Sequence, residues 1–241
     1  MTGPALCLQV VNTQEELRLN PRRLVIAGFT GRDERAVAAH VAELAAIGVP
    51  IPSTTPTFYG LDPELLTTSP LVYVRSRTTS GEVEPVIIRS GGRLFLGVGS
   101  DHTDRELESV GILEAKAACP KPVSRSVVAL PTDLTRFNWD RVVVEASVDG
   151  ELYQAGAVAA IRPAQDLLSL VPIAADASDD DLILFCGTLP LVAETFIYGT
   201  RWQLALQLPD GTTLSHTYHS LYGQDVPRPQ TAQLAQPDGP S

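Results

Sequence analysis

The stretch from Thr78 to Glu108 reads TTSGEVEPVIIRSGGRLFLGVGSDHTDRELE, and it decides the fold of this 241-residue chain. Its two apolar runs, Glu82–Arg89 and Arg93–Gly99, predict two strands. The intervening Ser90-Gly91-Gly92 contains the glycines that supply the positive φ angles of tight hairpin turns. We therefore expect this stretch to form an antiparallel β-hairpin.

Acidic residues lie at the open end of this hairpin. Glu82 and Glu84 are two residues apart, so a strand places both carboxylates on one face. If the loop is Gly91-Gly92, Glu82 lies opposite Asp101, and Glu84 lies opposite Gly99, which has no side chain to fill the space between them. The three carboxylates then surround a small void and repel one another unless a cation lies among them. Such hard oxygen ligands favour Mg²⁺ or Mn²⁺ over Zn²⁺.

This arrangement depends on the strand register. A three-residue loop would turn Asp101 to the other face. Pro85, within the first strand, favours an edge or a bulge. The alternative to a metal site is a polar end of the hairpin at which the acidic side chains are solvated.

The same residues carry a resemblance to the fumarylacetoacetate hydrolase superfamily. Its members show Glu-x-Glu on one strand and then Asn-Asp-x-x-Ala-Arg-Asp-x-Gln, and this chain has Glu82-Val-Glu84 and then Ser100-Asp-His-Thr-Asp-Arg-Glu-Leu-Glu108. The metal position Asp101 and the arginine position Arg105 match. Four positions differ from the pattern: Ser100, Asp104, Glu106 and Glu108. The resemblance covers roughly residues 24–220 and implies that Glu82, Glu84 and Asp101 bind the metal.

Two later segments extend the resemblance. The family has a lysine a little over a dozen residues beyond its arginine segment, and Lys121 stands in that place. The segment Phe185-Cys-Gly187-Thr188-Leu-Pro190 is similar to the Gly-Thr-Pro loop that closes over the substrate. The resemblance implies that Lys121 is catalytic and that Arg105, Glu108 and Thr188 contact the substrate. From the residues alone, Lys121 is an ordinary solvated lysine and the Gly-Thr segment a plain turn.

A helical pattern runs from Thr30 to Gly48, with Thr30 or Asp33 placed to cap its start. His40 and Glu43 are three residues apart on this helix, so the carboxylate can orient the imidazole. Taken alone, such a pair is usually a surface feature. Small family members carry a lid helix with His-x-x-Glu and then a proline-rich run, to which Pro50–Tyr59 is similar. The resemblance therefore implies that His40 and Glu43 are catalytic.

Composition excludes several classes of protein. The net charge of −10 disfavours nucleic acid and anionic membranes as partners. The three cysteines, Cys7, Cys119 and Cys186, are odd in number and far apart, so they signal neither a disulfide framework nor a zinc site. The N-terminus lacks the features of a signal peptide, and no apolar run reaches the roughly 18 residues needed to span a bilayer. We therefore expect a cytoplasmic protein.

The predicted fold class is α+β and strand-dominated, and the resemblance implies the mixed β-sandwich roll of the superfamily. We divide the chain into N-terminal strands with a lid helix (1–70), a catalytic β-roll domain (71–224) and a disordered tail (225–241). The tail prediction rests on its lack of periodicity and its many Pro and Gln residues. The family also implies a homodimer.

The site and the resemblance together predict the function. The first hypothesis is a divalent-metal-dependent hydrolase that cleaves a carbon–carbon bond in a 1,3-dicarbonyl, acylpyruvate-like acid through an enolate, with Mg²⁺ or Mn²⁺ as cofactor. The second is a 2-oxo acid decarboxylase, hydratase or isomerase of the same superfamily. The third is a metal-binding module without catalysis. Glu108, where the family has glutamine, leaves the substrate itself open.

Overall fold

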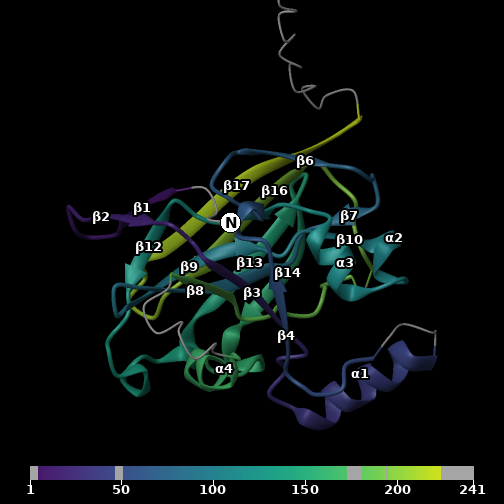
Figure 1. The fold of residues 1–241 in the computed structure, drawn as a ribbon, viewed down its shortest axis with the longest axis horizontal. Coiled ribbons are helices and arrows are strands. Elements are labelled where there is room, and N and C mark those ends of the chain that lie inside the picture. Colours follow the sequence, from purple (N-terminus) through teal and green to yellow (C-terminus); the bar gives the residue numbers. More distant parts are fainter. Residues whose placement is uncertain (1–4, 47–50, 173–180, 194, 224–241) are drawn as a thin grey trace, which may run out of the picture.

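The computed structural model describes residues 5–46, 51–172, 181–193 and 195–223. Strands dominate this part of the chain, and the helices lie around their edges (Figure 1). The predicted strand-dominated α+β class is therefore confirmed. The predicted tail, residues 225–241, lies outside the described residues.

The hairpin that opens the sequence argument forms as predicted. Strands β8 (Val83–Ser90) and β9 (Arg93–Ser100) are antiparallel, and Ser90 pairs with Arg93. The loop is therefore Gly91-Gly92, and the two glycines have φ angles of 55° and 74°. Such angles are strained for residues with a side chain, so the Gly-Gly pair selects the two-residue loop and with it the register.

The hairpin lies at the centre of an eight-stranded sheet with the order β2-β1-β12-β9-β8-β15-β3-β4. The other strands of this sheet are β1 (Leu6–Val10), β2 (Glu16–Leu19), β3 (Arg23–Gly28), β4 (Thr57–Leu61), β12 (Ser126–Ala129) and β15 (Leu182–Phe185). Strand β1 pairs in parallel with β12, and β3 pairs in parallel with β15. The first four strands, β1 to β4, therefore belong to the same sheet as the hairpin.

Pro85 lies inside the central strand β8 rather than at an edge or a bulge. It pairs with Val98 in an unbroken register, and its carbonyl accepts a hydrogen bond from Cys186 N at 3.0 Å. The β15 ladder ends at Phe185, opposite Val86. Proline is tolerated because it stands where the regular pairing with β15 stops, so no ladder donor is missing.

A second sheet has five strands in the order β14-β13-β16-β17-β6. Their bounds are β6 (Leu71–Val74), β13 (Val143–Val148), β14 (Glu151–Ala157), β16 (Arg201–Gln207) and β17 (Thr213–Tyr222). Two short pairs complete the strands: β7 (Thr79–Ser80) with β10 (Thr103–Asp104), and β5 (Leu66–Thr67) with β11 (Lys121–Pro122).

The two sheets share one hydrophobic core. Ile87 and Leu96 of the hairpin lie in the same buried cluster as Trp202 and Leu204 of the second sheet. Neighbouring positions of the hairpin, such as Ile88, lie in a second cluster on the opposite face. Because successive side chains on a strand point to opposite faces, the hairpin is buried on both sides and needs the nearly continuous apolar sequence that it has.

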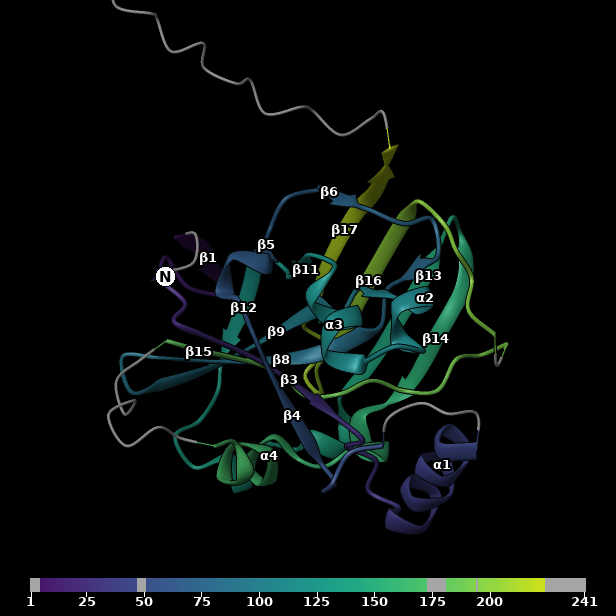
Figure 2. The same cartoon turned by 45° about the vertical axis from the view of Figure 1, so that its right-hand side comes forward.

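The described structure has four α-helices, of which α1 and α4 lie below the strands in Figure 2. They are α1 (Glu34–Ala46), α2 (Arg105–Glu108), α3 (Ile112–Ala117) and α4 (Ala164–Leu170), and short 3₁₀ turns cover Pro63–Leu65, Leu134–Arg136, Trp139–Arg141 and Val158–Ala160. Asp33 caps α1 by accepting hydrogen bonds from Arg35 N and Ala36 N, as its position predicted. In the described part of the chain no helix is long and apolar enough to cross a membrane.

Candidate metal centre

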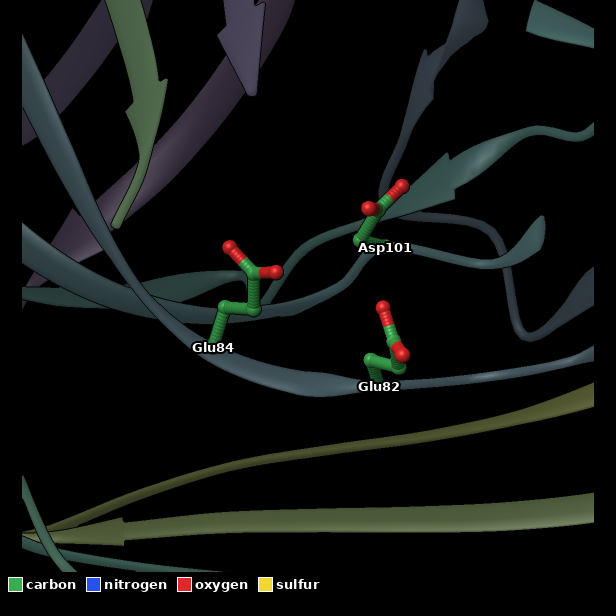
Figure 3. Close-up of side chains that lie close together, drawn as sticks. All are labelled: Glu82, Glu84 and Asp101. Atoms are coloured by element: carbon green, nitrogen blue, oxygen red, sulfur yellow. The ribbon is translucent and has the colours of Figure 1, made fainter. Parts of the chain in front are cut away.

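The strand register brings the three predicted carboxylates together. Glu84 pairs with Gly99, and Asp101 N donates a hydrogen bond to Glu82 O at 3.0 Å. One oxygen from each of Glu82, Glu84 and Asp101 lies within 4.8 Å of the other two (Figure 3). Glu84 and Asp101 are buried, whereas the side chain of Glu82 keeps 16% of its surface exposed. We call these three residues the carboxylate cluster.

The space above Gly99 is not the void that the sequence predicted. A Cβ atom at Gly99 would lie 2.7 Å from Phe185 Cε1 and 2.8 Å from Val86 Cγ2. The Phe185 ring therefore takes the place of the missing side chain and closes one side of the cluster. Glycine is required here because the ring packs directly on the backbone.

Glu84 is held by the turn that follows β15. Gly187 N donates a hydrogen bond to Glu84 Oε2 at 2.8 Å, and Gly187 has a φ of 98°, which favours glycine. Burial, reinforced by the negative charge of Asp101, raises the pKa of Glu84 well above its ordinary value, although the Lys116 ammonium opposes this shift. The charged form of Glu84 thus gains from any additional cation in the cluster.

Asp101 is the most strongly neutralised member of the cluster. Lys116 Nζ donates a hydrogen bond to Asp101 Oδ2, and Lys121 Nζ lies 3.2 Å from Asp101 Oδ1. Burial alone would raise the pKa of Asp101, but the two ammonium groups outweigh it and lower the pKa to about 2. Asp101 Oδ1 accepts no hydrogen bond, so a buried oxygen remains with bonding capacity.

Sequence reasoning missed Lys116, which lies in the last turn of α3. Burial would lower its pKa, but the charges of Asp101, Glu82 and Glu84 raise it. A compositional signal could have found this residue. Of the 18 basic residues in the chain only Lys116 and Lys121 are lysines, and both lie against Asp101.

Lys121 approaches Asp101 from inside the protein. Its Nζ donates hydrogen bonds to His102 O at 2.6 Å, to Cys119 O at 3.2 Å and to Lys116 O. The side chain has no exposed surface, and this burial lowers its pKa despite the nearby Asp101 charge. The resemblance implied that Lys121 is catalytic; in this structure its ammonium contacts three backbone carbonyls and Asp101.

Arg105 and Glu108, both predicted to bind the substrate, are hydrogen-bonded to each other in this structure. Arg105 donates from Nη1 to Glu108 Oε2 at 3.0 Å and from Nε to Ser80 Oγ at 2.7 Å. Its Nη2 lies 3.0 Å from Glu82 Oε1, and its guanidinium carbon lies 4.2 Å from the centre of the Phe196 ring. Only 4% of the Arg105 side chain is exposed, so its direct effect is to hold Glu82 in place.

The Thr188 hydroxyl also has its hydrogen-bond partners within the protein. Its hydroxyl donates to Val83 O at 2.9 Å and accepts from Gln154 Nε2 at 2.8 Å. The Gly-Thr turn holds a carboxylate of the protein itself, because Gly187 N donates a hydrogen bond to Glu84 Oε2.

His40 and Glu43 lie on the exposed helix α1 and are not brought to the carboxylate cluster in this structure. His40 Nδ1 is 3.8 Å from Glu43 Oε2, and their side chains are 61% and 78% exposed. The ring centre of His40 lies 6.2 Å from that of Phe29. The two residues are therefore neighbours, as the helical spacing predicted, but they face solvent.

His102, next to Asp101, offers no alternative base. Its Nδ1 lies 2.9 Å from Tyr218 Oη and its Nε2 lies 3.0 Å from Thr79 Oγ1, so both ring nitrogens have partners. The ring is fully buried, and this burial, together with the nearby charges of Lys121 and Arg105, lowers its pKa to about 3. His102 is therefore a neutral structural residue.

An open hollow of about 590 Å³ lies elsewhere on the protein, between the 3₁₀ turns and α4. Its lining includes Arg32, Phe137, Trp139 and Gln165 but no member of the carboxylate cluster. We place the chemistry at the cluster because convergent charged groups, rather than the size of a hollow, define a reactive site. The cluster is closed by side chains, among them Lys116.

The fold and the cluster place this chain in the fumarylacetoacetate hydrolase fold class. A structure from Oleispira antarctica, described as that of a candidate fumarylacetoacetate isomerase/hydrolase, aligns with a TM-score of 0.61 at 17% identity over 89% of this chain and 99% of that one. A candidate fumarylpyruvate hydrolase from Burkholderia cenocepacia aligns with a TM-score of 0.59 at 17% identity, covering 89% and 91%. The 5-carboxymethyl-2-hydroxymuconate delta-isomerase of Mycobacterium smegmatis aligns with a TM-score of 0.57 at 13% identity, covering 88% and 86%. At these identities the likeness establishes the fold.

The sequence itself matches a family described as "Protein of unknown function (DUF2848)" over residues 27–218, and the chain belongs to that family. The comparison with curated proteins found no match.

Proposed function

We propose that this protein is a divalent-ion-dependent enzyme that cleaves a carbon–carbon bond in an acylpyruvate-like dicarbonyl acid through an enolate. One observation carries the proposal: oxygens of Glu82, Glu84 and Asp101 converge within 4.8 Å. Asp101 Oδ1 is buried and forms an ion pair with Lys121 Nζ at 3.2 Å, but it accepts no well-aligned hydrogen bond. An all-oxygen donor set of this kind fits Mg²⁺ or Mn²⁺.

The ion would be held by the carboxylate cluster. When bound, it would supply positive charge that favours the enolate form of a 2-oxo acid. Two side chains and one backbone amide keep the cluster in position: Arg105 holds Glu82, Lys121 holds Asp101, and Gly187 N holds Glu84. Their role in this proposal is to preorganise the ligands, which reduces the cost of ordering them during the reaction.

Substrate recognition would come from the partly exposed rim of the cluster. The Glu108 side chain is 28% exposed, and the half-buried Tyr59 ring lies 5.9 Å from Lys116 Nζ. In this proposal Arg105 keeps Glu108 oriented toward the rim, while Thr188 fixes the backbone of Val83 beside Glu84. Arg105 and Thr188 thus shape the substrate site through their neighbours.

We assign water activation to His40, oriented by Glu43, after closure of α1. Contacts fix the start of this helix: Arg162 Nη2 lies 2.8 Å from Glu34 Oε1, and Arg32 pairs with Asp140 at 2.7 Å. In the described structure His40 has no partner on the two sheets. In this proposal α1 moves over the cluster when a substrate is bound.

A second candidate is a reaction of the same enolate without an activated water, namely decarboxylation or isomerisation of a 2-oxo acid. The exposure of His40 and the fully bonded nitrogens of His102 favour it, because neither ring reaches the cluster in this structure. A hydratase would need the same water as the hydrolase. A metal-binding module without catalysis is the remaining outcome.

A substrate screen tests the proposal. Purified protein with Mg²⁺ or Mn²⁺ would be assayed against acylpyruvates, oxaloacetate and hydroxydienoates, with products identified by mass spectrometry and with Glu84→Gln as the matched control. Ion-dependent cleavage of an acylpyruvate in the wild type alone supports hydrolysis. Turnover of oxaloacetate only supports the second candidate. Ion binding without any turnover supports the binding module.

The proposed enzyme acts on a small dicarbonyl or 2-oxo acid. A homodimer, which the family resemblance implies, and a cytoplasmic location, which the sequence indicates, complete the proposal, and both stay predictions.

A further inference from the structure

Lys116 lies where a cation bound to the carboxylate cluster would be expected. Its Nζ donates a hydrogen bond to Asp101 Oδ2, and its charge also acts on Glu82 and Glu84. These are the same three residues whose oxygens lie within 4.8 Å of one another. The repulsion among the carboxylates is therefore already relieved in part by a side chain of the protein itself.

The two lysines at Asp101 differ in their freedom to move. Lys121 has no exposed surface and binds three backbone carbonyls, so its departure would leave those carbonyls without a donor. Lys116 keeps 8% of its side-chain surface exposed, and within the described structure Asp101 is the only hydrogen-bond partner of its Nζ. Lys116 can therefore leave the cluster without breaking backbone hydrogen bonds.

The Tyr59 ring offers the Lys116 ammonium a second favourable contact near the cluster. The centre of the Tyr59 ring is 5.9 Å from Nζ, within the range in which an aromatic face attracts a cation. Tyr59 is half-buried on β4. An ammonium displaced from Asp101 would thus keep a favourable contact at the rim of the cluster.

We propose that Lys116 is an internal cation of the site, and that its ammonium and a divalent ion occupy the carboxylate cluster in turn. The proposal rests on the metal site proposed above. Two cations at one carboxylate oxygen repel each other, so ion binding requires Lys116 to leave Asp101 Oδ2. A monovalent ion carries the same charge as the tethered ammonium and competes poorly with it, so the arrangement favours divalent ions.

The presence of only two lysines allows a direct test on the wild-type protein. With lysine labelled at the ε-carbon, NMR should show two signals, which Lys116→Arg would assign. Titration with Mg²⁺ should move the Lys116 signal toward that of a mobile side chain and leave the Lys121 signal nearly unchanged. A Lys116 signal that stays in place while calorimetry records ion binding would overturn the proposal.

Calorimetry with Mn²⁺ gives the second test. Lys116→Met should bind Mn²⁺ more tightly by roughly tenfold or more, because the ion no longer displaces an ammonium group. Arg201→Met, which removes one positive charge from an exposed position on β16, should leave the affinity within about twofold of wild type.

The outcomes separate this proposal from the proposed function. Equal or weaker affinity in Lys116→Met overturns the role of Lys116 and leaves the metal site standing. Binding only in Lys116→Met supports it. An absence of binding in both proteins overturns the metal site and the role of Lys116 together. If Lys116→Met does not fold, the NMR titration of the wild type decides.

Discussion

Lys121 Nζ lies 3.2 Å from Asp101 Oδ1, and neither side chain has any exposed surface. The pair joins Asp101, which directly follows β9, to the short strand β11, whose Lys121 also binds three carbonyls. Breaking a buried ion pair on one side leaves an uncompensated charge, which is strongly destabilising. Because of this contact, we expect the removal of Asp101 and the removal of Glu84 to have different effects on the free energy of unfolding.

Asp101→Asn should destabilise the ion-free protein by about 3 to 5 kcal/mol, because Lys116 and Lys121 lose their shared counter-charge. Glu84→Gln should leave the free energy of unfolding nearly unchanged or raise it, because burial and the Asp101 charge raise the pKa of Glu84 and make its ionised form costly. Urea denaturation in EDTA would measure both. Both variants should lose Mn²⁺ binding in calorimetry. Equal stabilities for the two variants would contradict the asymmetry seen in the structure.

Lys121→Met should lower the free energy of unfolding by about 3 kcal/mol or more, because buried carbonyls lose their donor and Asp101 loses a partner. Lys116→Met, which frees no backbone carbonyl, should cost less. Thermal unfolding of the two variants makes the comparison. A stable Lys121→Met protein with normal Mn²⁺ affinity but no turnover would instead show the catalytic role that the family resemblance implied.

Gly99→Ala should destabilise the protein by about 1 to 3 kcal/mol, because the new Cβ would lie 2.7 Å from the Phe185 ring. The shift of β9 away from Phe185 would also move Glu84 and weaken Mn²⁺ binding. Gly60→Ala is the matched control, since a Cβ at Gly60 on β4 would meet no atom within 4 Å. Denaturation and calorimetry on both variants test the close packing beside the cluster.

His40→Ala should keep wild-type Mn²⁺ affinity and lower kcat by roughly 10² to 10⁴, the loss expected for a general base. Glu43→Gln should show the same effect more weakly. Arg35→Ala is the control on the same helix, because a separation of five residues places Arg35 on a different side of α1 from His40. Full activity in His40→Ala would show that His40 and Glu43 are surface residues without a catalytic role, and it would favour the second candidate function.

Acid should weaken the protein through His216, which is 8% exposed on β17. Burial lowers the pKa of His216 to about 4. Unprotonated His216 is favoured in the folded protein, because its proton binds more tightly in the unfolded chain. Its contribution to the free energy of unfolding is therefore fully present above pH ~6.5. This contribution falls by at most about 3 kcal/mol as the pH drops to about 4.

His216→Leu should therefore lose less stability than wild type between pH 7 and pH 4.5, because about pH 7 lies just above that window and about pH 4.5 lies near its acid end. His219→Gln, on the opposite face of the same strand, is the control and should follow the wild type. Urea denaturation at the two pH values gives the comparison. An identical loss in His216→Leu and wild type would exclude this residue as a source of the acid sensitivity.

The sequence by itself determined the features that depend on local geometry. Glycines at 91 and 92 select a two-residue loop, and the loop sets the register that places Glu82, Glu84 and Asp101 together. The helix that carries His40 begins where Asp33 can cap it. Loops, caps and strand faces follow from neighbouring residues, so they could be predicted without the structure.

Only the tertiary structure decided which groups surround those carboxylates. Arg105 turned out to bind Glu82, Phe185 fills the space above Gly99, and Lys116 reaches Asp101 from α3. Burial is the physical reason. A charged side chain that loses its water must find its counter-charge within the protein, and that choice depends on how segments far apart in the sequence pack against one another.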